Sequence, residues 1–376
     1  MDFSHQRIAI VHDTFYQYGG AERVVDALCE VFPSADVFVS RFSNNPSVKH
    51  LVSKVTKTTF LQHLPWVPLI NKLYVPLLPL AFESLDLRSY DIVISSTAHF
   101  AKGVLTNSDQ LHVCYCHTPP RFLYGYSSET SFRSTKIGTF FLSGIDHKLR
   151  EYDFVASQRP DIIITNSQTT QKRINKFYKR DAHVIYPPIN TMRLNPTSTV
   201  IKHDYFLVVS RLVSYKNVKT VISAFNQNKQ KLIVVGEGNQ AAELKNLAES
   251  NITFTSFVSD TELVNLYQKA RAVIFATADE DFGIVPVESM AAGTPVIALK
   301  SGGVTETVDE QTGIFYDKNT VEHLNTAVSS FIANEHTFNS EALVTSAQKY
   351  SKEAFIENIK QTVYKKLQTI TSEILE

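Results

Sequence analysis

Residues 272–301 read AVIFATADEDFGIVPVESMAAGTPVIALKS, and this stretch decides the fold class. The runs AVIFAT (272–277) and PVIALKS (295–301) are short and apolar, which is typical of buried strands. The segment GIVPVESMAAG (283–293) between them has helical spacing. A strand, a crossover helix and a second strand make up the repeating unit of a parallel sheet.

The same alternation of apolar run, turn and helical segment recurs in both halves of the chain. The other predicted strands are RIAIVHD (7–13), DIVISS (91–96), LHVCYCH (111–117), DIIITNS (161–167), YFLVVSR (205–211), KLIVVGEG (231–238) and ITFTSF (252–257). Continuous apolar strands require helices on both faces of their sheet. The sequence therefore predicts an α/β fold with one doubly wound, Rossmann-like parallel sheet in each half.

A connection without regular structure separates the two halves. Residues 186–204, YPPINTMRLNPTSTVIKHD, carry three prolines and no strong hydrophobic periodicity, which is typical of a link between domains. We therefore expect a first domain over 1–188 and a second over 189–351. The final stretch, 352–376, has apolar side chains at three- and four-residue spacings, so we expect a helix that docks this apolar stripe.

Composition and charge argue against several classes of protein. The chain has 37 Lys and Arg and 37 Asp and Glu, so its net charge is zero and no nucleic-acid partner is expected. Its three cysteines form no CxxC pair, which argues against a disulfide framework and a zinc site. The N-terminus has no secretory signal pattern, and no apolar run approaches the roughly 20 residues of a membrane-spanning helix. We expect a cytoplasmic protein.

In the first half, two motifs follow predicted strands, where ligands gather in open α/β sheets. Gly19 and Gly20 precede a helix whose N-terminal amides suit an anion, although a Gly-Gly pair by itself more often reflects plain turn geometry. His117 ends the strand LHVCYCH rather than lying within it, which makes a functional role as plausible as the structural role of most lone histidines. Cys114 and Cys116 form a CxC pattern on that strand, and packing explains their alternation better than metal binding.

In the second half, cations and a glycine turn follow the first two predicted strands. Arg211 and Lys216 lie in the loop of SRLVSYKNV, where they suit a diphosphate, with a solvated loop as the alternative. Gly236 belongs to VVGEGNQA, which matches the GxGxxA nicotinamide fingerprint. The match falls on the second strand of its half instead of the first, so we favour turn geometry near a nucleotide.

The strongest chemical signal is a pair of carboxylates in the opening stretch. Glu280 and Glu288 stand eight positions apart, with Phe282 and Gly283 between them. Pro286 favours a loop that enters a helix, so we expect Glu280 in the loop and Glu288 in the helix. Carboxylates accept hydrogen bonds from sugar and ribose hydroxyls, and nearby cations and amides suit a leaving diphosphate.

Together these motifs resemble the retaining glycosyltransferases of family 4. The resemblance covers nearly the whole chain through GGAER, the strand-tip His117, SRLVSYKNV, VGEG, FVSDTEL, the E-x7-E element, GTPVIAL and SGGVTETV. HDTFYQYGGAERVV and CYCHTPPRFLYG are most similar to the WbaZ-like, GDP-mannose-dependent mannosyltransferase branch, associated with bacterial surface polysaccharides. The resemblance implies the GT-B architecture, in which two Rossmann-like domains face a cleft and the C-terminal helix crosses back to the first domain.

The resemblance also implies how a nucleotide-sugar donor is held. It assigns Arg211 and Lys216 to the donor diphosphate, aided by the backbone near Gly20. It places Phe257 and Val258 beside the base. Leaving-group charge in this class is handled by side chains and amides, and no DxD motif stands where an inverting GT-A enzyme would place its metal, so we expect no essential metal and no cofactor.

For the sugar, the resemblance assigns Glu280 to the transferred residue, assisted by the amides around Phe282 and Gly283. It assigns Glu288 to the ribose and places His117 near the donor sugar and the reaction centre. The family often has Glu-Gly-Phe-Gly where this chain has an Asp directly after Glu280, so sugar identity stays open. The donor phosphate is thought to take the acceptor proton, and no protein nucleophile is assigned.

The function that the resemblance predicts is transfer of mannose from GDP-mannose to a lipid-linked or growing surface-polysaccharide oligosaccharide, with retention and an α-glycosidic bond. Three alternatives stay open. They are a family 4 enzyme with a UDP-sugar donor, a GT-B-like sugar-nucleotide epimerase, and a catalytically silent subunit that binds a nucleotide sugar.

One aromatic segment is the candidate for contact with the acceptor. It reads FLQHLPWVPLINKLYVPLLPLAF, starts at Phe60 and ends at Phe82. Trp66, Tyr74 and many leucines suit a bilayer interface where a lipid-linked glycan is presented, and core beneath a loop is the alternative. Peripheral contact with the inner face of the cytoplasmic membrane is therefore an expectation beside the cytoplasmic one.

Overall fold

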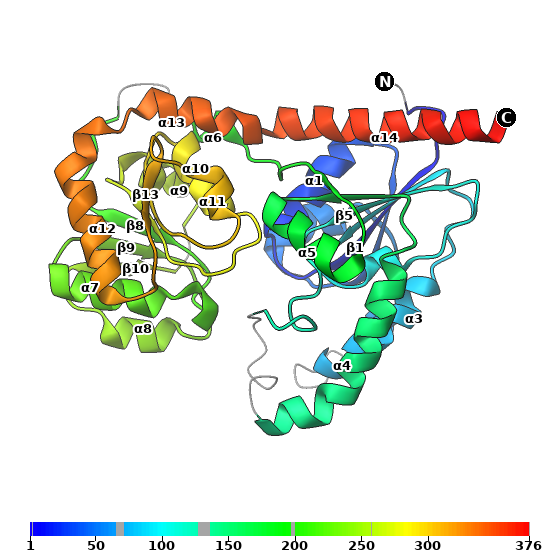
Figure 1. The fold of residues 1–376 in the computed structure, drawn as a ribbon, viewed down its shortest axis with the longest axis horizontal. Coiled ribbons are helices and arrows are strands. Elements are labelled where there is room, and N and C mark those ends of the chain that lie inside the picture. Colours follow the sequence, from blue (N-terminus) through cyan, green and yellow to red (C-terminus); the bar gives the residue numbers. More distant parts are fainter. Residues whose placement is uncertain (2, 65–70, 127–135, 197–199, 257, 376) are drawn as a thin grey trace. The chain divides into compact units, whose positions relative to one another are not determined.

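The computed structural model describes residues 1, 3–64, 71–126, 136–196, 200–256 and 258–375. The chain divides into two compact units, Met1–Pro188 with Glu353–Glu376, and Ile189–Lys352. Each unit is built on one sheet, and all the described strand pairs are parallel (Figure 1). The prediction of an α/β fold with one doubly wound sheet in each half is confirmed.

The first unit holds a seven-stranded sheet in the order β3-β2-β1-β4-β5-β6-β7. Its strands are β1 Ile8–Phe15, β2 Asp36–Phe42, β3 Val55–Thr58, β4 Ile92–Thr97, β5 Leu111–Cys116, β6 Ile162–Thr165 and β7 His183–Val184. Alternate residues of β1 pack into two different cores: Ile8 and Ile10 on one face, Ala9 and Val11 on the other. Burial of both faces explains why the strand is a continuous apolar run.

Helices cover both faces of this sheet. They are α1 Gly20–Val31, α2 Lys49–Val52, α3 Leu78–Glu83, α4 Lys136–Ala156 and α5 Gln168–Tyr178, with the 3₁₀ turns η1 Pro46–Val48, η2 Phe60–His63, η3 Asn71–Leu77 and η4 Ala101–Gly103. Leu28 of α1 belongs to the core of one face, and Phe82 of α3 and Leu149 of α4 belong to the core of the other.

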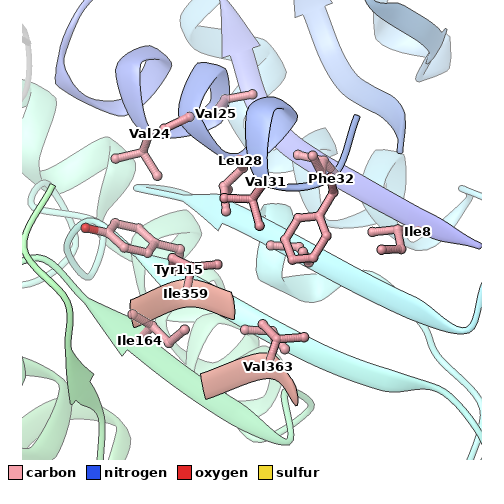
Figure 2. Close-up of a cluster of buried hydrophobic side chains, with 14 of the residues drawn as sticks. Ile8, Val24, Val25, Leu28, Val31, Phe32, Tyr115, Ile164, Ile359 and Val363 are labelled. Atoms are coloured by element: carbon pink, nitrogen blue, oxygen red, sulfur yellow. The ribbon is translucent and has the colours of Figure 1, made fainter. Parts of the chain in front are cut away.

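The C-terminal helix, α14 (Lys352–Leu375), packs on the first unit. Phe355, Ile359 and Val363 follow one another at four-residue spacing and are at most 2% exposed. They share a core with Val24 of α1 and Tyr115 of β5, and Figure 2 shows Ile359 and Val363 directed into it. The expectation that the terminal helix returns to the first domain is confirmed.

The second unit holds a six-stranded sheet in the order β10-β9-β8-β11-β12-β13. Its strands are β8 Phe206–Val209, β9 Leu232–Val235, β10 Ile252–Thr255, β11 Val273–Phe275, β12 Val296–Leu299 and β13 Gly313–Tyr316. Its helices are α6 Thr191–Leu194, α7 Val218–Asn228, α8 Ala241–Leu247, α9 Asp260–Lys269, α10 Ile284–Ala291, α11 Val304–Thr307, α12 Val321–Asn334 and α13 Ser340–Ala347, with the 3₁₀ turns η6 Ser214–Lys216, η7 Glu335–Thr337 and η8 Gln348–Tyr350.

Strand β2 is not among the predicted strands, because its sequence DVFVSRF carries two polar residues near its end. Both are buried and bonded to the backbone: the Ser40 hydroxyl donates to the Asp13 carbonyl, and the Arg41 guanidinium donates to the Leu64 carbonyl at 3.1 Å. Partners supplied by distant parts of the chain make this strand possible, and a local apolar pattern does not show them.

The aromatic segment that starts at Phe60 divides between core and surface. Leu61 and Phe82 are buried, whereas Phe60 is 40% and Leu80 is 59% exposed. Trp66 lies outside the described residues. The segment is therefore core in part and exposed surface in part. Across the described ranges, no helix combines the length and the apolar character needed to cross a bilayer.

Replacing Phe355 with alanine tests the docking of α14. We expect this change to lower the free energy of unfolding by about 3 to 5 kcal/mol, because it removes a buried aromatic ring from a closed core. Asn358 is exposed on the same helix, so Asn358→Ala is the matched control, with an expected effect within about 0.5 kcal/mol. Urea unfolding measures both, and equal midpoints for the two variants would contradict the docking.

Candidate active site

The loop after β8 carries the two predicted cations of the second unit. Arg211 is exposed just beyond the strand, and Lys216 is the last residue of the turn η6, separated from α7 by Asn217 alone. Asn217 closes the turn with a left-handed backbone (φ 56°), and its side-chain amide donates to the Ala276 carbonyl at 2.9 Å. This bond ties the cation loop to the loop after β11, which contains Glu280.

Lys216 and Glu280 form an ion pair between these two loops. Their side chains are 13% and 23% exposed, so the pair is partly shielded from water. Arg211 has a different partner, since its guanidinium donates to the Tyr215 hydroxyl at 2.7 Å. The structure thus pairs Lys216, which the resemblance assigns to the donor diphosphate, with Glu280, which it assigns to the transferred sugar.

Two consecutive glycines hold the backbone of Glu280. The Gly303 amide donates to the Glu280 carbonyl at 2.8 Å, and Gly302 forms a parallel bridge with Glu280. Gly302 has a φ of 72°, and a Cβ on it would overlap the Glu280 carbonyl, while a Cβ on Gly303 would overlap the Asp281 carbonyl. Only glycine permits this approach of two backbones. The sequence showed these glycines as part of SGGVTETV without assigning them a role.

Gly236 allows a similar close approach to the loop after β8. Its φ is 143°, and a Cβ on it would overlap the Ser210 carbonyl, while a Cβ on Gly238 would overlap the Leu212 carbonyl. The Leu212 amide also donates to the Glu237 carbonyl at 2.8 Å. The glycine turn therefore packs against the loop that carries the two predicted cations.

Helix α10 starts at the carboxylate loop, with Gly283 (φ 92°) as its N-cap. Phe282 is 3% exposed, and its ring packs against Tyr350 with 5.5 Å between centroids, so this side chain anchors the loop. Glu288 lies in the helix, as its position after Pro286 indicated. It is 3% exposed and accepts a hydrogen bond from the Tyr267 hydroxyl at 2.8 Å.

The two residues expected beside the base are only partly described. Phe257 lies outside the described residues. Val258 is half-buried and comes directly before Ser259, the N-cap of α9. The Ser259 amide donates to Glu262 at 2.8 Å in a capping box, which fixes the start of this helix.

In the first unit, Gly19 is the N-cap of α1 and Gly20 is its first residue. The Gly19 amide donates to the Glu22 carboxylate at 3.0 Å. A carboxylate of the protein therefore already binds at this helix N-terminus, where the sequence predicted an anion. The sequence analysis did not single out Glu22, although GGAER contains it.

His117 lies one residue beyond β5, at the strand tip that its sequence position indicated. It is 8% exposed, and its Nε2 lies 2.9 Å from the Ser96 hydroxyl. Burial, together with the neighbouring His12, lowers the pKa of His117 to about 3. The ring is therefore neutral over the physiological pH range.

Asp13 is a buried group that the sequence analysis missed, although it directly ends the first predicted strand. Its carboxylate accepts hydrogen bonds from the Thr97 hydroxyl and from the amides of residues 98–101, at 2.6 to 3.1 Å. Burial alone would raise its pKa, but these bonds and the nearby His99 and His12 hold the pKa of Asp13 well below its usual range. Asp13 fixes the loop after β4.

Cys114 and Cys116 are buried together against Ile163 and Ile174, so their alternation reflects packing, as predicted. Within the part of the chain that the structure describes, no group of three or more His, Cys, Asp or Glu side chains is placed to hold a metal ion.

Each of the two units matches a known protein family. Residues 18–193 match the family model described as Glycosyltransferase Family 4, and residues 196–355 match the model described as Glycosyl transferases group 1. The chain belongs to glycosyltransferase family 4. The enzyme is therefore a glycosyltransferase, as the sequence predicted.

Two curated relatives of this family 4 glycosyltransferase carry more specific names. Alpha-1,3/1,6-mannosyltransferase ALG2 of Homo sapiens is 27% identical over 292 residues, which is 67% of this chain and 67% of ALG2. The O-antigen chain mannosyltransferase RfbU of Salmonella typhimurium is 30% identical over 189 residues, which is 45% of this chain. The aligned part spans 53% of the length of RfbU.

Solved structures share the fold of the family 4 enzyme along nearly its whole length. Sucrose-phosphate synthase of Thermosynechococcus elongatus superposes with a TM-score of 0.74 at 20% identity, covering 97% of this chain and 99% of that one. Anabaena Alr3699/HepE, in complex with UDP, gives a TM-score of 0.71 at 17% identity and covers 96% and 100%. These matches and the two parallel sheets confirm the GT-B fold class.

A methyl group at Gly236 tests the packing of the glycine turn. Gly236→Ala should lower stability by about 1 to 3 kcal/mol, because it forces a side chain into an unfavourable backbone conformation and against the Ser210 carbonyl. Gly144 of α4 has open space around its Cβ position, so Gly144→Ala should be neutral or stabilising by up to about 1 kcal/mol. Thermal unfolding compares them, and equal shifts in both variants would refute the close approach.

Proposed function

We propose that this family 4 enzyme transfers mannose from GDP-mannose, with retention, to a lipid-linked or growing surface-polysaccharide oligosaccharide. The observation that carries the proposal is the Lys216–Glu280 pair on glycine-fixed loops, since it offers a cation and a carboxylate to one donor molecule. The choice of mannose and of a glycan acceptor is supported by the names of two relatives, both of which are mannosyltransferases.

A nucleotide sugar carries the groups that these residues suit. Lys216 and Arg211 neutralise the diphosphate, whose charge grows as the sugar leaves, and the amides that start α10 at Gly283 add partial positive charge. Glu280 accepts hydrogen bonds from the sugar hydroxyls. Glu288, oriented by the Tyr267 hydroxyl, accepts those of the ribose. The proposal needs no metal ion, because these groups together stabilise the leaving diphosphate.

The transfer step itself needs no protein nucleophile. The acceptor hydroxyl attacks the anomeric carbon on the face from which the diphosphate leaves, and the donor phosphate takes the hydroxyl proton. His117, which is neutral, supplies a hydrogen bond to the substrate at this point. When the enzyme holds donor and acceptor in this geometry, the reaction becomes effectively unimolecular. The bound acceptor hydroxyl then reacts in preference to water.

A UDP-sugar is the second donor candidate. Val258 is the described residue expected beside the base, and its side chain has no hydrogen-bonding group to select guanine over uracil. An epimerase or a silent binding subunit shares the donor site, and release of free epimerised sugar nucleotide without an acceptor would identify the former.

We also propose that the acceptor is met at the inner face of the cytoplasmic membrane. Support comes from the aromatic segment that starts at Phe60, where Phe60, Leu77 and Leu80 expose apolar side chains. Exposed apolar groups of this kind insert into the interface between headgroups and acyl chains.

Thermal unfolding with GDP, GDP-mannose, UDP and UDP-glucose tests the donor. A ligand that binds only the folded protein stabilises it, by about 2.7 kcal/mol when present at 100 times its Kd. We expect a rise in Tm with GDP and GDP-mannose and none with the uridine compounds. Selective stabilisation by UDP and UDP-glucose would overturn the choice of donor.

Lys216→Ala locates the binding in the same experiment. Loss of one charge-assisted contact with the diphosphate costs about 2 to 5 kcal/mol, so the stabilisation by GDP should disappear. Lys219 stands three residues further along and pairs with Glu243 at 2.7 Å on the surface, so Lys219→Ala should keep the full stabilisation. Wild-type stabilisation in Lys216→Ala would reject the assigned diphosphate site.

A further inference from the structure

The ends of three neighbouring strands bring a row of polar side chains together in the first unit. β4 lies between β1 and β5, with His12 paired to Ser96 and Thr97 paired to Cys116. His117 continues this ladder beyond β5 by donating its amide to the Thr97 carbonyl at 2.8 Å. His12, Ser96 and His117 are 2%, 0% and 8% exposed. They form a buried row across the sheet.

Hydrogen-bond geometry fixes one proton of His12. Its Nδ1 lies 2.9 Å from the Ser96 carbonyl oxygen and 3.1 Å from the Ser96 hydroxyl oxygen. A carbonyl oxygen only accepts hydrogen bonds, so Nδ1 of His12 carries a hydrogen. The Ser96 hydroxyl oxygen, within reach of the same N–H, is its second acceptor.

Ser96 in turn fixes the tautomer of His117. Its Oγ lies 2.9 Å from Nε2 of His117. The hydroxyl has one hydrogen. Nδ1 of His12 already carries a hydrogen and cannot accept another, so Ser96 donates its hydrogen to Nε2 of His117. His117 then carries its own hydrogen on Nδ1. The other tautomer would leave a buried hydroxyl hydrogen without an acceptor among the described residues.

Carboxylates favour positive charge at the other end of the row. Glu22 Oε1 lies 3.8 Å from Nε2 of His12. Burial lowers the pKa of His12, but Glu22, Asp13 and the Ser96 carbonyl outweigh burial and leave this pKa above its ordinary value. Positive charge on His12 in turn disfavours protonation of His117. Positive charge in this row is therefore favoured on His12 and disfavoured on His117, which lies at the strand tip.

We propose that Ser96 and His12 are positioning residues, which hold His117 neutral and present its Nδ1–H as the hydrogen-bond donor to the substrate. The use of that donor in sugar transfer rests on the proposed function, whereas the tautomer does not. A donor of fixed orientation stabilises developing charge on an oxygen without reorganising during the reaction. A neutral ring also retains its hydrogen instead of releasing it to the leaving diphosphate.

The other face of β4 supplies a matched control. Ser95 is also fully buried, and its Oγ lies 2.9 Å from Nε2 of His112. Successive residues of a strand point to opposite faces of the sheet, so this second serine–histidine pair lies away from the row. Ser95→Ala therefore measures what loss of a buried hydroxyl from β4 costs by itself.

NMR on the full chain with ¹⁵N-labelled histidine rings reads the tautomer directly. Correlations between ring carbon-bound protons and ring nitrogens show which nitrogen of His117 is protonated, and His117→Gln assigns its signals. We expect Nδ1–H in the wild type and in Ser95→Ala. In Ser96→Ala, where Nε2 has lost its donor, we expect Nε2–H or a mixture.

Kinetics then show whether the tautomer matters. With GDP-mannose as the probe, water as the acceptor and GDP release as the readout, Ser96→Ala should lower kcat about 10- to 100-fold and leave KM within about twofold, since removing such a donor outright costs about 10²- to 10³-fold. Ser96→Thr keeps the hydroxyl and should recover most of the rate. Ser95→Ala should match the wild type.

Three results would overturn the proposal: Nε2–H on His117 in the wild type, an unchanged tautomer in Ser96→Ala, or equal losses of kcat in Ser96→Ala and Ser95→Ala. Absence of GDP release by the wild type is a different failure. It would show that the enzyme does not hydrolyse GDP-mannose, so the choice of donor would rest on the thermal unfolding experiment, while the NMR spectra would still decide the arrangement of Ser96 and His117.

Discussion

Close packing of backbone against backbone, at positions too tight for a Cβ, holds the loops after the strands of the second sheet in place. Gly236 and Gly238 let the loop after β8 pack against their backbone. Gly302 and Gly303 do the same for the loop after β11. The Lys216–Glu280 pair depends on both contacts, because each partner stands on one of these loops. An ion pair between two separate loops keeps its geometry only if each loop is held rigidly.

The first unit fixes its corresponding loop with a charge instead of with glycines. The Asp13 carboxylate gathers the amides that follow β4, and the gain from these bonds exceeds the cost of burying the charge. Ser96 lies just before this loop, so the same support fixes the serine that contacts His117. Both units thus use ordinary backbone chemistry to hold a few polar side chains at strand ends.

The sequence predicted those parts of the protein that depend on local pattern. Apolar runs and helical spacing indicated both sheets, the strand-tip position of His117, and the placement of Glu280 in a loop and Glu288 in a helix. The roles of His12 and Ser96 depend on which strands are neighbours and in what register, and a single sequence does not contain this information. Phe282 shows the same limit, because its burial against Tyr350 comes from a residue 68 positions away in the chain.

Hydrogen–deuterium exchange of the enzyme with and without GDP-mannose tests the central claim most directly, namely that the glycine-fixed loops of the second sheet bind the donor. The account predicts slower exchange at 211–217, 236–240 and 280–285 when the donor is present. The same unit has an open hollow at the opposite strand ends, lined by His203, Lys231 and Asn251 among others, which should exchange as before. Protection at that hollow, with none at the three loops, would contradict the account.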